Sequence, residues 1–244
     1  MKIDILTLFP EMFEHTLGGS IIGRACENKI LEITATDIRE YSTDKHRKAD
    51  DYPFGGGAGM VMLAQPIFDA MEAVSAKGKK VVYMSPRGKV LDQQKIIELA
   101  DLDDLVILCG HYEGVDQRVI DYFEMEEISI GDYILTGGEL AAMVLVDSVA
   151  RLVPGVLAGE ESAMDESIYS GLLEYPQYTK PREFKGMEVP EVLVSGNHKL
   201  IDLWKFEQSL KLTKERRPDL YEAFVAQKDK LDKAHKKILE NMEE

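Results

Sequence analysis

Three glycine-bearing segments follow predicted strands, and their residue types suit the binding of a small molecule. They are Ser85–Gly88, Cys109–Gly114 and Ile130–Glu139. Glycine lets backbone amides and carbonyls approach a ligand closely. Such groups can pair with the edge of an adenine while apolar neighbours such as Tyr133 cover its faces. A tight turn would explain one such segment, but three at successive strand ends favour a ligand pocket, because α/β sheets bind ligands beyond the carboxyl ends of their strands.

A fourth glycine-rich segment, Tyr52–Met60, resembles a phosphate-binding loop in composition. It lacks the Gly-Lys-Ser/Thr ending of a P-loop and follows no obvious strand, and the chain has no GxGxxG pattern of dinucleotide-binding proteins. A nucleotide-hydrolysing enzyme is therefore the weakest of the functions that we consider.

Alternating strands and helices must position these segments. Several of the candidate strands are continuous apolar runs, as expected for a parallel sheet covered on both faces; the strands are Lys2–Leu8, Leu31–Asp37, Lys80–Ser85, Leu105–Gly110 and Glu126–Ser129. Candidate helices lie between these strands, at Ser20–Asn28, Gln65–Ala76, Asp92–Ala100 and Glu139–Leu152. A proline in the first turn marks the start of the second, and an N-cap aspartate marks the start of the third. This alternation predicts an α/β fold with a parallel sheet.

The chain divides into three predicted regions. Residues 1–157 form the α/β domain, and the polar, acidic and weakly periodic residues 158–171 form a flexible linker. Residues 172–244 form a small, mainly helical domain, with helices expected at Lys199–Leu212, at Pro218–Ala226 and towards the C-terminus. Trp204 has apolar neighbours at helical spacing, which favours a core position over base stacking.

Composition narrows the functional class. No apolar run is long enough to span a bilayer, and the N-terminus has no signal-peptide pattern. Two cysteines without CxxC spacing point to a reducing, cytoplasmic setting, and neither they nor the five histidines have metal-ligand spacing. We therefore predict no metal site from the residues. Cys109 is interpreted as a buried strand thiol.

The net charge of −15 is unusual for a protein that binds RNA. It is unevenly distributed, because residues 205–244 hold ten Lys or Arg and nine Asp or Glu, which leaves −16 on residues 1–204. Phosphate contacts would come from local basic clusters such as Lys45–Lys48 and Lys211–Arg217. Each single cluster is better explained as solvated surface charge.

Several motifs together resemble the bacterial tRNA (guanine-N1)-methyltransferases, which belong to the SPOUT class of trefoil-knotted methyltransferases. The resemblance runs from residue 3 to about residue 220. The motifs are specific in combination, although each alone is weak; they are Leu6–Phe13, Gly55–Met60, Leu108–Asp116, Ile130–Glu139, Gly171–Thr179 and Ser195–His198.

The resemblance implies a deep trefoil knot that binds S-adenosylmethionine in a bent conformation, and a homodimer with sites at the subunit interface. It implies methylation of N1 of guanine 37 in tRNA, the base 3′ of the anticodon, with the helical domain binding tRNA. A magnesium ion is also suggested, although the sequence shows no ligand cluster for it. The expected cofactor contacts are Tyr83, Ser85, Pro86, Gly110, Tyr112, Glu113, Ile130, Gly131, Tyr133, Leu135, Gly137 and Gly138.

Methylation of a guanine N1 needs a general base for its proton and a positive group near the guanine oxygen. In the family a linker aspartate and an arginine after the long helix serve these roles. The arginine corresponds to Arg151. The family's Asp-Ser-Phe pattern aligns with Glu166, Ser167 and Ile168, and Asp165 stands one residue earlier. We favour Glu166 as the base, because the register to the following Gly-Leu-Leu is then unbroken, and keep Asp165 as the alternative.

Other residues have two readings. Gly59 is expected to line the guanine pocket, and Asn197 and His198 to dock RNA, with a structural turn as the alternative for the latter pair. Glu113 would bind either the cofactor or the start of the following helix. The competing functions are a SPOUT enzyme acting at another RNA position and an RNA-binding protein of this fold with weak or altered methyltransferase activity.

Overall fold

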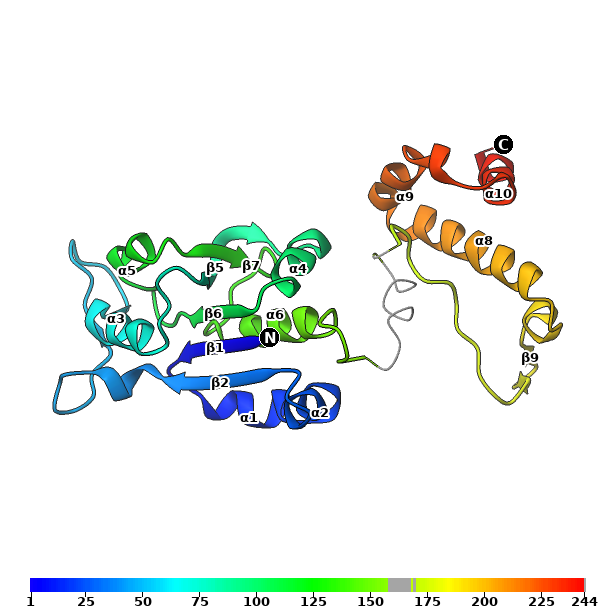
Figure 1. Ribbon diagram of the computed structural model, residues 1–244. Coiled ribbons are helices and arrows are strands. Elements are labelled where there is room, and N and C mark those ends of the chain that lie inside the picture. Colours follow the sequence, from blue (N-terminus) through cyan, green and yellow to red (C-terminus); the bar gives the residue numbers. More distant parts are fainter. Residues whose placement is uncertain (158–167, 169, 244) are drawn as a thin grey trace. The chain divides into compact units, whose positions relative to one another are not determined.

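The computed structural model describes residues 1–157, 168 and 170–243 (Figure 1). The chain forms two compact units, Met1–Gly159 and Glu160–Glu244. Asp165 and Glu166, the two candidate bases, lie outside the described residues.

A parallel sheet forms the centre of the first unit, which confirms the predicted α/β class. Its strand order is β2-β1-β6-β5-β7, and every neighbouring pair is parallel. The central strands β1, β5 and β6 each contain a run of five consecutive buried residues, so the middle of the sheet is covered on both faces. The strands are β1 (Lys2–Thr7), β2 (Glu32–Asp37), β5 (Lys80–Val90), β6 (Asp104–Cys109) and β7 (Glu126–Ser129).

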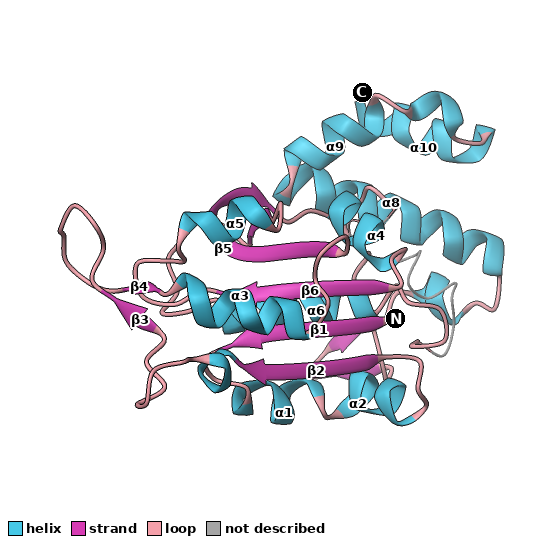
Figure 2. Cartoon of the chain, turned by 60° about the vertical axis from the view of Figure 1, so that its left-hand side comes forward, coloured by secondary structure: helices cyan, strands magenta, loops and turns pink. Residues whose placement is uncertain are grey.

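Helices cover both faces of this sheet (Figure 2). One apolar cluster joins the sheet to α1 (Glu11–Leu17), α2 (Ser20–Glu27), α4 (Gln93–Ala100) and α6 (Glu139–Ala150). A second cluster joins the opposite face to the 3-10 helix η1 (Ile38–Tyr41), α3 (Ala64–Ala73) and α5 (Gln117–Tyr122). Asp92 caps α4 as predicted, because its side chain accepts a hydrogen bond from the Lys95 amide.

Strand β5 is longer than its sequence suggests, and this corrects one prediction. The segment Ser85–Gly88 is not a free loop after the strand, because β5 continues to Val90. Met84 and Lys89 both pair with Ile128 of β7, so the segment between them bulges out of the ladder. Glycine is required inside the bulge: a Cβ on Gly88 would lie 2.3 Å from the Glu127 carbonyl.

Two ion pairs fix β7 at the edge of the sheet. The Glu126 carboxylate lies 2.6 Å from the Lys80 ammonium on β5 and 2.9 Å from the Lys95 ammonium on α4. Partial burial raises the pKa of Glu126, but hydrogen bonds from both lysines outweigh it and leave the pKa below its ordinary value. These contacts tie the strand that precedes the third glycine segment to its neighbours.

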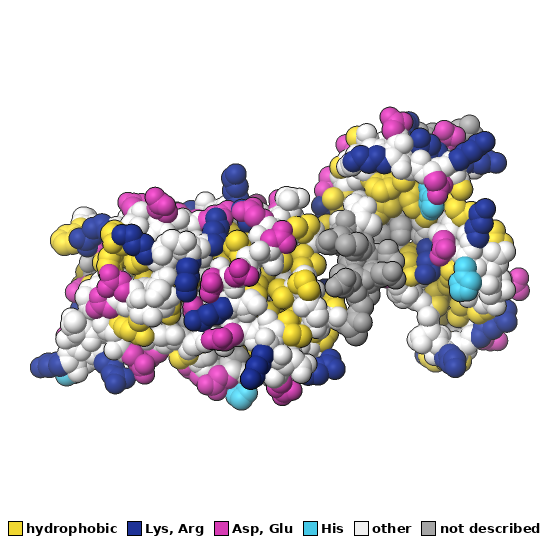
Figure 3. Space-filling view, in the orientation of Figure 1, with side chains coloured by type: hydrophobic (Ala, Val, Ile, Leu, Met, Phe, Trp, Pro, Cys, Tyr) yellow, Lys and Arg dark blue, Asp and Glu magenta, His cyan; other side chains and the backbone are white. Residues whose placement is uncertain are grey.

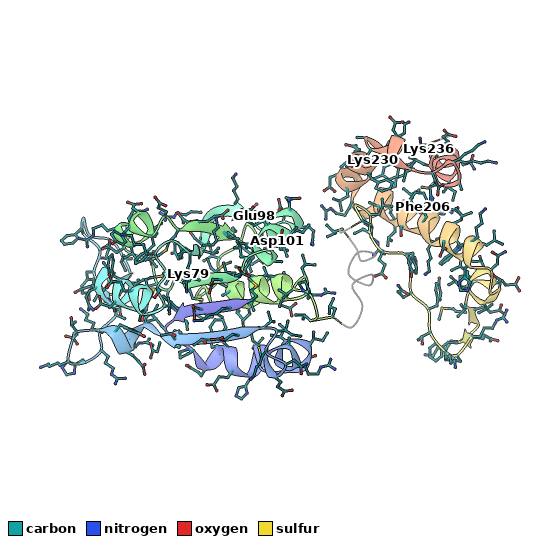
Figure 4. All side chains as sticks on the ribbon, in the orientation of Figure 1. Lys79, Glu98, Asp101, Phe206, Lys230 and Lys236 are labelled. Atoms are coloured by element: carbon teal, nitrogen blue, oxygen red, sulfur yellow. The ribbon has the colours of Figure 1, made fainter. Side chains whose placement is uncertain are left out.

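The second unit is mainly helical, with a short hairpin. Its core consists of Leu172, Leu210, Tyr221 and Leu239. Phe206 of α8, labelled in Figure 4, packs its ring 4.4 Å from that of His235 in α10. The described elements are β8 (Glu183–Phe184), β9 (Met187–Glu188), the 3-10 helices η2 (Glu191–Val194) and η3 (Lys228–Lys230), α8 (His198–Arg216), α9 (Pro218–Val225) and α10 (Lys233–Glu243).

Trp204 differs from its predicted core position. Among the described residues it lies outside the core of the second unit and is only partly buried. Its ring lies 6.5 Å from that of Tyr175 and 6.4 Å from that of Tyr178. The apolar spacing along α8 therefore does not place Trp204 on the face that packs against α9 and α10.

Candidate active site

A pocket of about 230 Å³ lies in the first unit, where β6 and β7 end and β5 bulges. The structure brings all twelve predicted cofactor contacts to its wall. The wall also includes residues that sequence reasoning did not select, among them Arg87 and His111. Both residues belong to the glycine-bearing segments and are adjacent to a glycine, and this sequence position could have identified them as pocket residues.

Close backbone packing holds the second segment, Cys109–Gly114, against the third, Ile130–Glu139. The Gly138 amide donates a hydrogen bond to the Gly110 carbonyl at 2.8 Å, and His111 forms an isolated bridge with Gly137. A Cβ on Gly138 would lie 2.9 Å from the Cα of Cys109, and one on Gly110 would lie 2.7 Å from the Tyr83 ring. Larger residues at these two positions would push the walls apart.

The pocket combines apolar surface with a few polar groups. Tyr83 is buried in its wall, and this burial raises the pKa of the Tyr83 hydroxyl. The Arg87 guanidinium makes two hydrogen bonds of 3.0 Å to the Glu127 carboxylate and one of 3.3 Å to Gln117. Arg87 and Glu113 bring charges of opposite sign to the same pocket.

Glu113 also contacts the fourth glycine segment. The Glu113 amide donates to the Met60 carbonyl at 2.9 Å, and a Cβ on Gly59 would lie 2.4 Å from the Glu113 side chain. Glu113 does not cap the following helix, because the N-cap of α5 is Asp116. Of its two proposed roles, capping is therefore wrong, and cofactor binding stays a prediction. Gly59 itself lies outside the pocket wall and adjoins it through Glu113.

Tyr52–Met60 lies between the two short strands β3 (Asp50–Asp51) and β4 (Val61–Met62), which pair antiparallel. Three consecutive glycines, Gly55–Gly57, have positive φ and open space where a side chain would stand. Phe54 at this loop is fully exposed. In this loop the positive φ angles explain the glycines, because a side chain would have space. At the pocket, the close contacts of Gly110 and Gly138 leave no space for a Cβ.

The remaining predicted site residues lie elsewhere. Arg151 is exposed and follows the last turn of α6. Asn197 and His198 belong to the second unit, where the Asn197 side chain accepts a hydrogen bond from the Leu200 amide and so caps α8. This observation supports the structural reading of Asn197, while His198 is exposed at the first helical position.

Within the described ranges, no three His, Cys, Asp or Glu side chains gather as a metal site would require. None of the helices in the described part of the chain is both long and apolar enough to cross a membrane. Basic and acidic side chains are interspersed on the face of the first unit seen in Figure 3.

The first unit thus has a parallel sheet with a pocket lined by glycine segments, and a mainly helical unit follows it in the chain. Residues 1–223 match the family tRNA (Guanine-1)-methyltransferase TrmD, and the chain belongs to this family. The predicted class of enzyme, a tRNA guanine-N1 methyltransferase, is thereby confirmed.

Curated relatives named as tRNA guanine-N1 methyltransferases match this chain over almost their whole lengths. A tRNA (guanine-N(1)-)-methyltransferase of Ruminiclostridium cellulolyticum is 58% identical over 91% of this chain and 96% of its own. Relatives of that name from Clostridium perfringens and Clostridium acetobutylicum are 56% and 54% identical over 99% and 100% of this chain. They cover 100% and 98% of their own lengths.

Proposed function

We propose that this chain transfers a methyl group from S-adenosylmethionine to N1 of guanine 37 in tRNA, as a homodimer with a trefoil knot around the cofactor. The observation that supports the cofactor assignment is the pocket at the strand ends: residues of all three glycine segments line it, and two of the segments pack backbone against backbone. The tRNA substrate would place the reaction in the cytoplasm.

The pocket residues fit the cofactor. The backbones of Gly137 and Gly110 line the pocket together with apolar side chains such as Ile130 and Leu135, and this combination suits the edge and the faces of an adenine. Arg87 and Glu113 carry charges opposite to those of the carboxylate and ammonium of an amino acid. The cofactor carries the methyl group on a positively charged sulfur. Transfer of the methyl group breaks the S–CH₃ bond, and the sulfur is left as a neutral thioether.

The chemistry at guanine requires a balanced transfer of one methyl group and one proton. As the N1–CH₃ bond forms, the N1 proton passes to a carboxylate, and the electron pair of the N–H bond stays on the ring. We propose Glu166 for this base, with Asp165 as the alternative. Arg151 would stabilise the negative charge that develops on the guanine oxygen.

Exposed apolar side chains on α6 support a dimer in which this helix packs against the partner subunit. Leu140 and Val144, one helical turn apart, are 51% and 46% exposed. Apolar side chains at this spacing form a stripe that a second copy would cover. The same helix begins at the pocket and ends at Arg151, so a partner on this face would complete the site.

The second unit is proposed to bind tRNA, with His198 at its contact surface, Asn197 capping the helix that carries His198, and residues 158–171 as the linker. The loop with Gly59 would receive the target guanine. Magnesium stays a prediction that rests on the family resemblance.

The test is methyl transfer from radiolabelled S-adenosylmethionine to an unmodified tRNA transcript. We expect label in a transcript with guanine at position 37 and none when adenine replaces it, with the label mapped to N1. Binding of S-adenosylhomocysteine by calorimetry separates loss of cofactor binding from loss of transfer. Protein that binds cofactor but labels neither transcript would contradict the proposed reaction.

A further inference from the structure

A buried carboxylate beside the pocket has no role in the proposed methyl transfer. Glu139 is 2% exposed and is the first residue of α6. The N-terminus of a helix favours a negative charge, yet a buried carboxylate is costly unless other groups hydrogen-bond to it. The partners of Glu139 therefore indicate what the carboxylate holds in place.

These partners come from the ends of two strands. The Thr7 hydroxyl at the end of β1 donates a hydrogen bond of 2.8 Å to Glu139 Oε1. The same hydroxyl accepts one of 3.0 Å from the Phe9 amide. On the other side, His111 Nε2 after β6 lies 3.6 Å from Glu139 Oε2.

The contacts close into a ring. The Phe9 ring lies 5.1 Å from the His111 ring, so Glu139, Thr7, Phe9 and His111 each contact the next; we call these four residues the Glu139 ring. A Cβ on Gly137 would lie 2.3 Å from Glu139 Oε2 and 2.4 Å from His111 Nε2. The backbone of the third glycine segment thus packs directly against this ring.

Only His111 of the four lines the pocket. Its neighbour Tyr112 lines the pocket too, has a positive φ of 59° and lies with its ring 5.3 Å from that of His111. A non-glycine residue keeps such a backbone conformation only where its surroundings hold it. Of the four residues of the Glu139 ring, His111 is the one whose contact with Tyr112 is on the wall.

We propose that Glu139 is a positioning residue: through His111 and Thr7 it fixes the His111–Tyr112 wall against which the amino acid or adenosine part of the cofactor binds. The proposal rests on the proposed function for the identity of the ligand. Glu139 touches no substrate, and its effect reaches the cofactor through His111.

The main variant is Glu139→Gln, which keeps the shape of the side chain and removes its charge. We expect the Kd for S-adenosylhomocysteine to rise about tenfold, the effect of weakening one charge-assisted hydrogen bond to a neutral one. The KM for tRNA should change less than twofold. Thr7→Val, which removes the hydroxyl at nearly constant volume, should weaken cofactor binding more than Thr7→Ser, which keeps it.

A double variant tests whether the effect passes through His111. The effects of Glu139→Gln and His111→Ala on cofactor Kd should fall well short of additivity when combined, because the two residues belong to one contact network. Additive effects would overturn the route through His111.

The matched control is Asp4→Asn. Asp4 is a buried carboxylate, 4% exposed, on the same strand β1 but at its other end, where it pairs with Lys2 at 3.5 Å and Lys79 at 3.8 Å. It should lower the melting temperature and leave the cofactor Kd unchanged. If Glu139→Gln behaves in the same way, Glu139 is only structural and the proposal is wrong.

Amide hydrogen exchange of the ligand-free protein gives a readout that needs no cofactor. Glu139→Gln should speed exchange at residues 110–114, whereas Asp4→Asn should not. Unchanged exchange at these amides would overturn the proposal even if the wild-type protein failed to bind the cofactor. Wild-type protein that binds the cofactor but methylates no tRNA would instead contradict the proposed function alone.

Discussion

Replacing Gly138 with alanine places a methyl group against the backbone of the neighbouring strand end. Gly138 precedes α6 with φ of −78°, a conformation that alanine adopts freely. The added Cβ would lie 2.9 Å from both Cys109 Cα and the Gly110 nitrogen. Both are backbone atoms, so no side-chain rotation relieves the contact.

The size of the effect follows from this distance. Ordinary contact begins near 3.4 Å, so the two segments must separate by roughly 0.5 Å. Overpacking of this kind costs about 1–3 kcal/mol of unfolding free energy. For a unit of this size, that corresponds to a melting temperature lower by roughly 2–12 °C. Misplacement by about 1 Å costs on the order of a hundredfold in rate, so half of it predicts about a tenfold loss in kcat/KM for S-adenosylmethionine.

Thermal unfolding, calorimetry with S-adenosylhomocysteine and steady-state kinetics below the melting transition measure these effects. Gly19→Ala is the matched control, because Gly19 is not part of the pocket wall, a Cβ there meets its nearest atom at 3.9 Å, and φ is −109°. It should leave the cofactor Kd unchanged. A Gly138→Ala protein with wild-type melting temperature and cofactor Kd would refute the close contact on which this reasoning depends.

Three further predictions concern single side chains. Arg151→Ala should lower kcat on the order of a hundredfold with little change in KM for the cofactor, and Arg151→Lys should recover only part of it, because lysine lacks the planar fork; an equal loss in cofactor affinity would contradict its assigned role. Burial raises the pKa of the Cys109 thiol well above its ordinary value, with the Glu139 charge adding to it, and Cys109 is fully buried. Iodoacetamide should therefore modify the partly exposed Cys26 first in native protein, as peptide mapping would detect, and equal labelling of both would count against this. The pKa of Glu126 is lowered in the folded protein, so its ionised carboxylate stabilises the fold. The full contribution is present at pH values above the unfolded carboxyl pKa of about 4.3, and it is lost as the pH falls through the lower pKa of the folded protein. Glu126→Gln should thus lower the melting temperature at pH 7, with the difference shrinking below about pH 4; a difference that persists there would point to packing instead.

The five strands of the main sheet and most of the helices were predictable from the sequence, but α1 and α5 were not. Strand β7 has its predicted bounds, Glu126–Ser129, and the turn-forming residues Gly131 and Asp132 follow it closely. Helix α1 was missed: it spans only Glu11–Leu17, and its N-cap, Pro10, offers no side-chain hydrogen bond. Helix α5, Gln117–Tyr122, is equally short and was not given bounds. Their helical conformation depends on tertiary packing, which local sequence patterns do not record.

At the candidate site, too, only part of the structure could be predicted from the sequence. The pocket wall was predictable because glycines at strand ends leave a local pattern along the chain. The Glu139 ring left none, since its hydrogen bond joins residues 132 positions apart. Likewise, nothing local reveals that Ser85–Gly88 bulges out of a continuing strand, because the pairing residue, Ile128, comes from another part of the chain. Contacts of this type follow from the sheet order, and the sheet order follows from packing.

The sheet order has a consequence for synthesis on the ribosome. Strand β1 lies between β2 and β6, and its residue Lys2 pairs with Asp104, which is translated 102 residues later. At typical elongation rates this delay lasts about 5–20 s. Throughout it, one edge of an apolar strand has no partner, and a two-stranded β1–β2 ribbon is marginal by itself. The nascent chain is therefore most vulnerable to aggregation, and most in need of chaperones, before β6 leaves the exit tunnel.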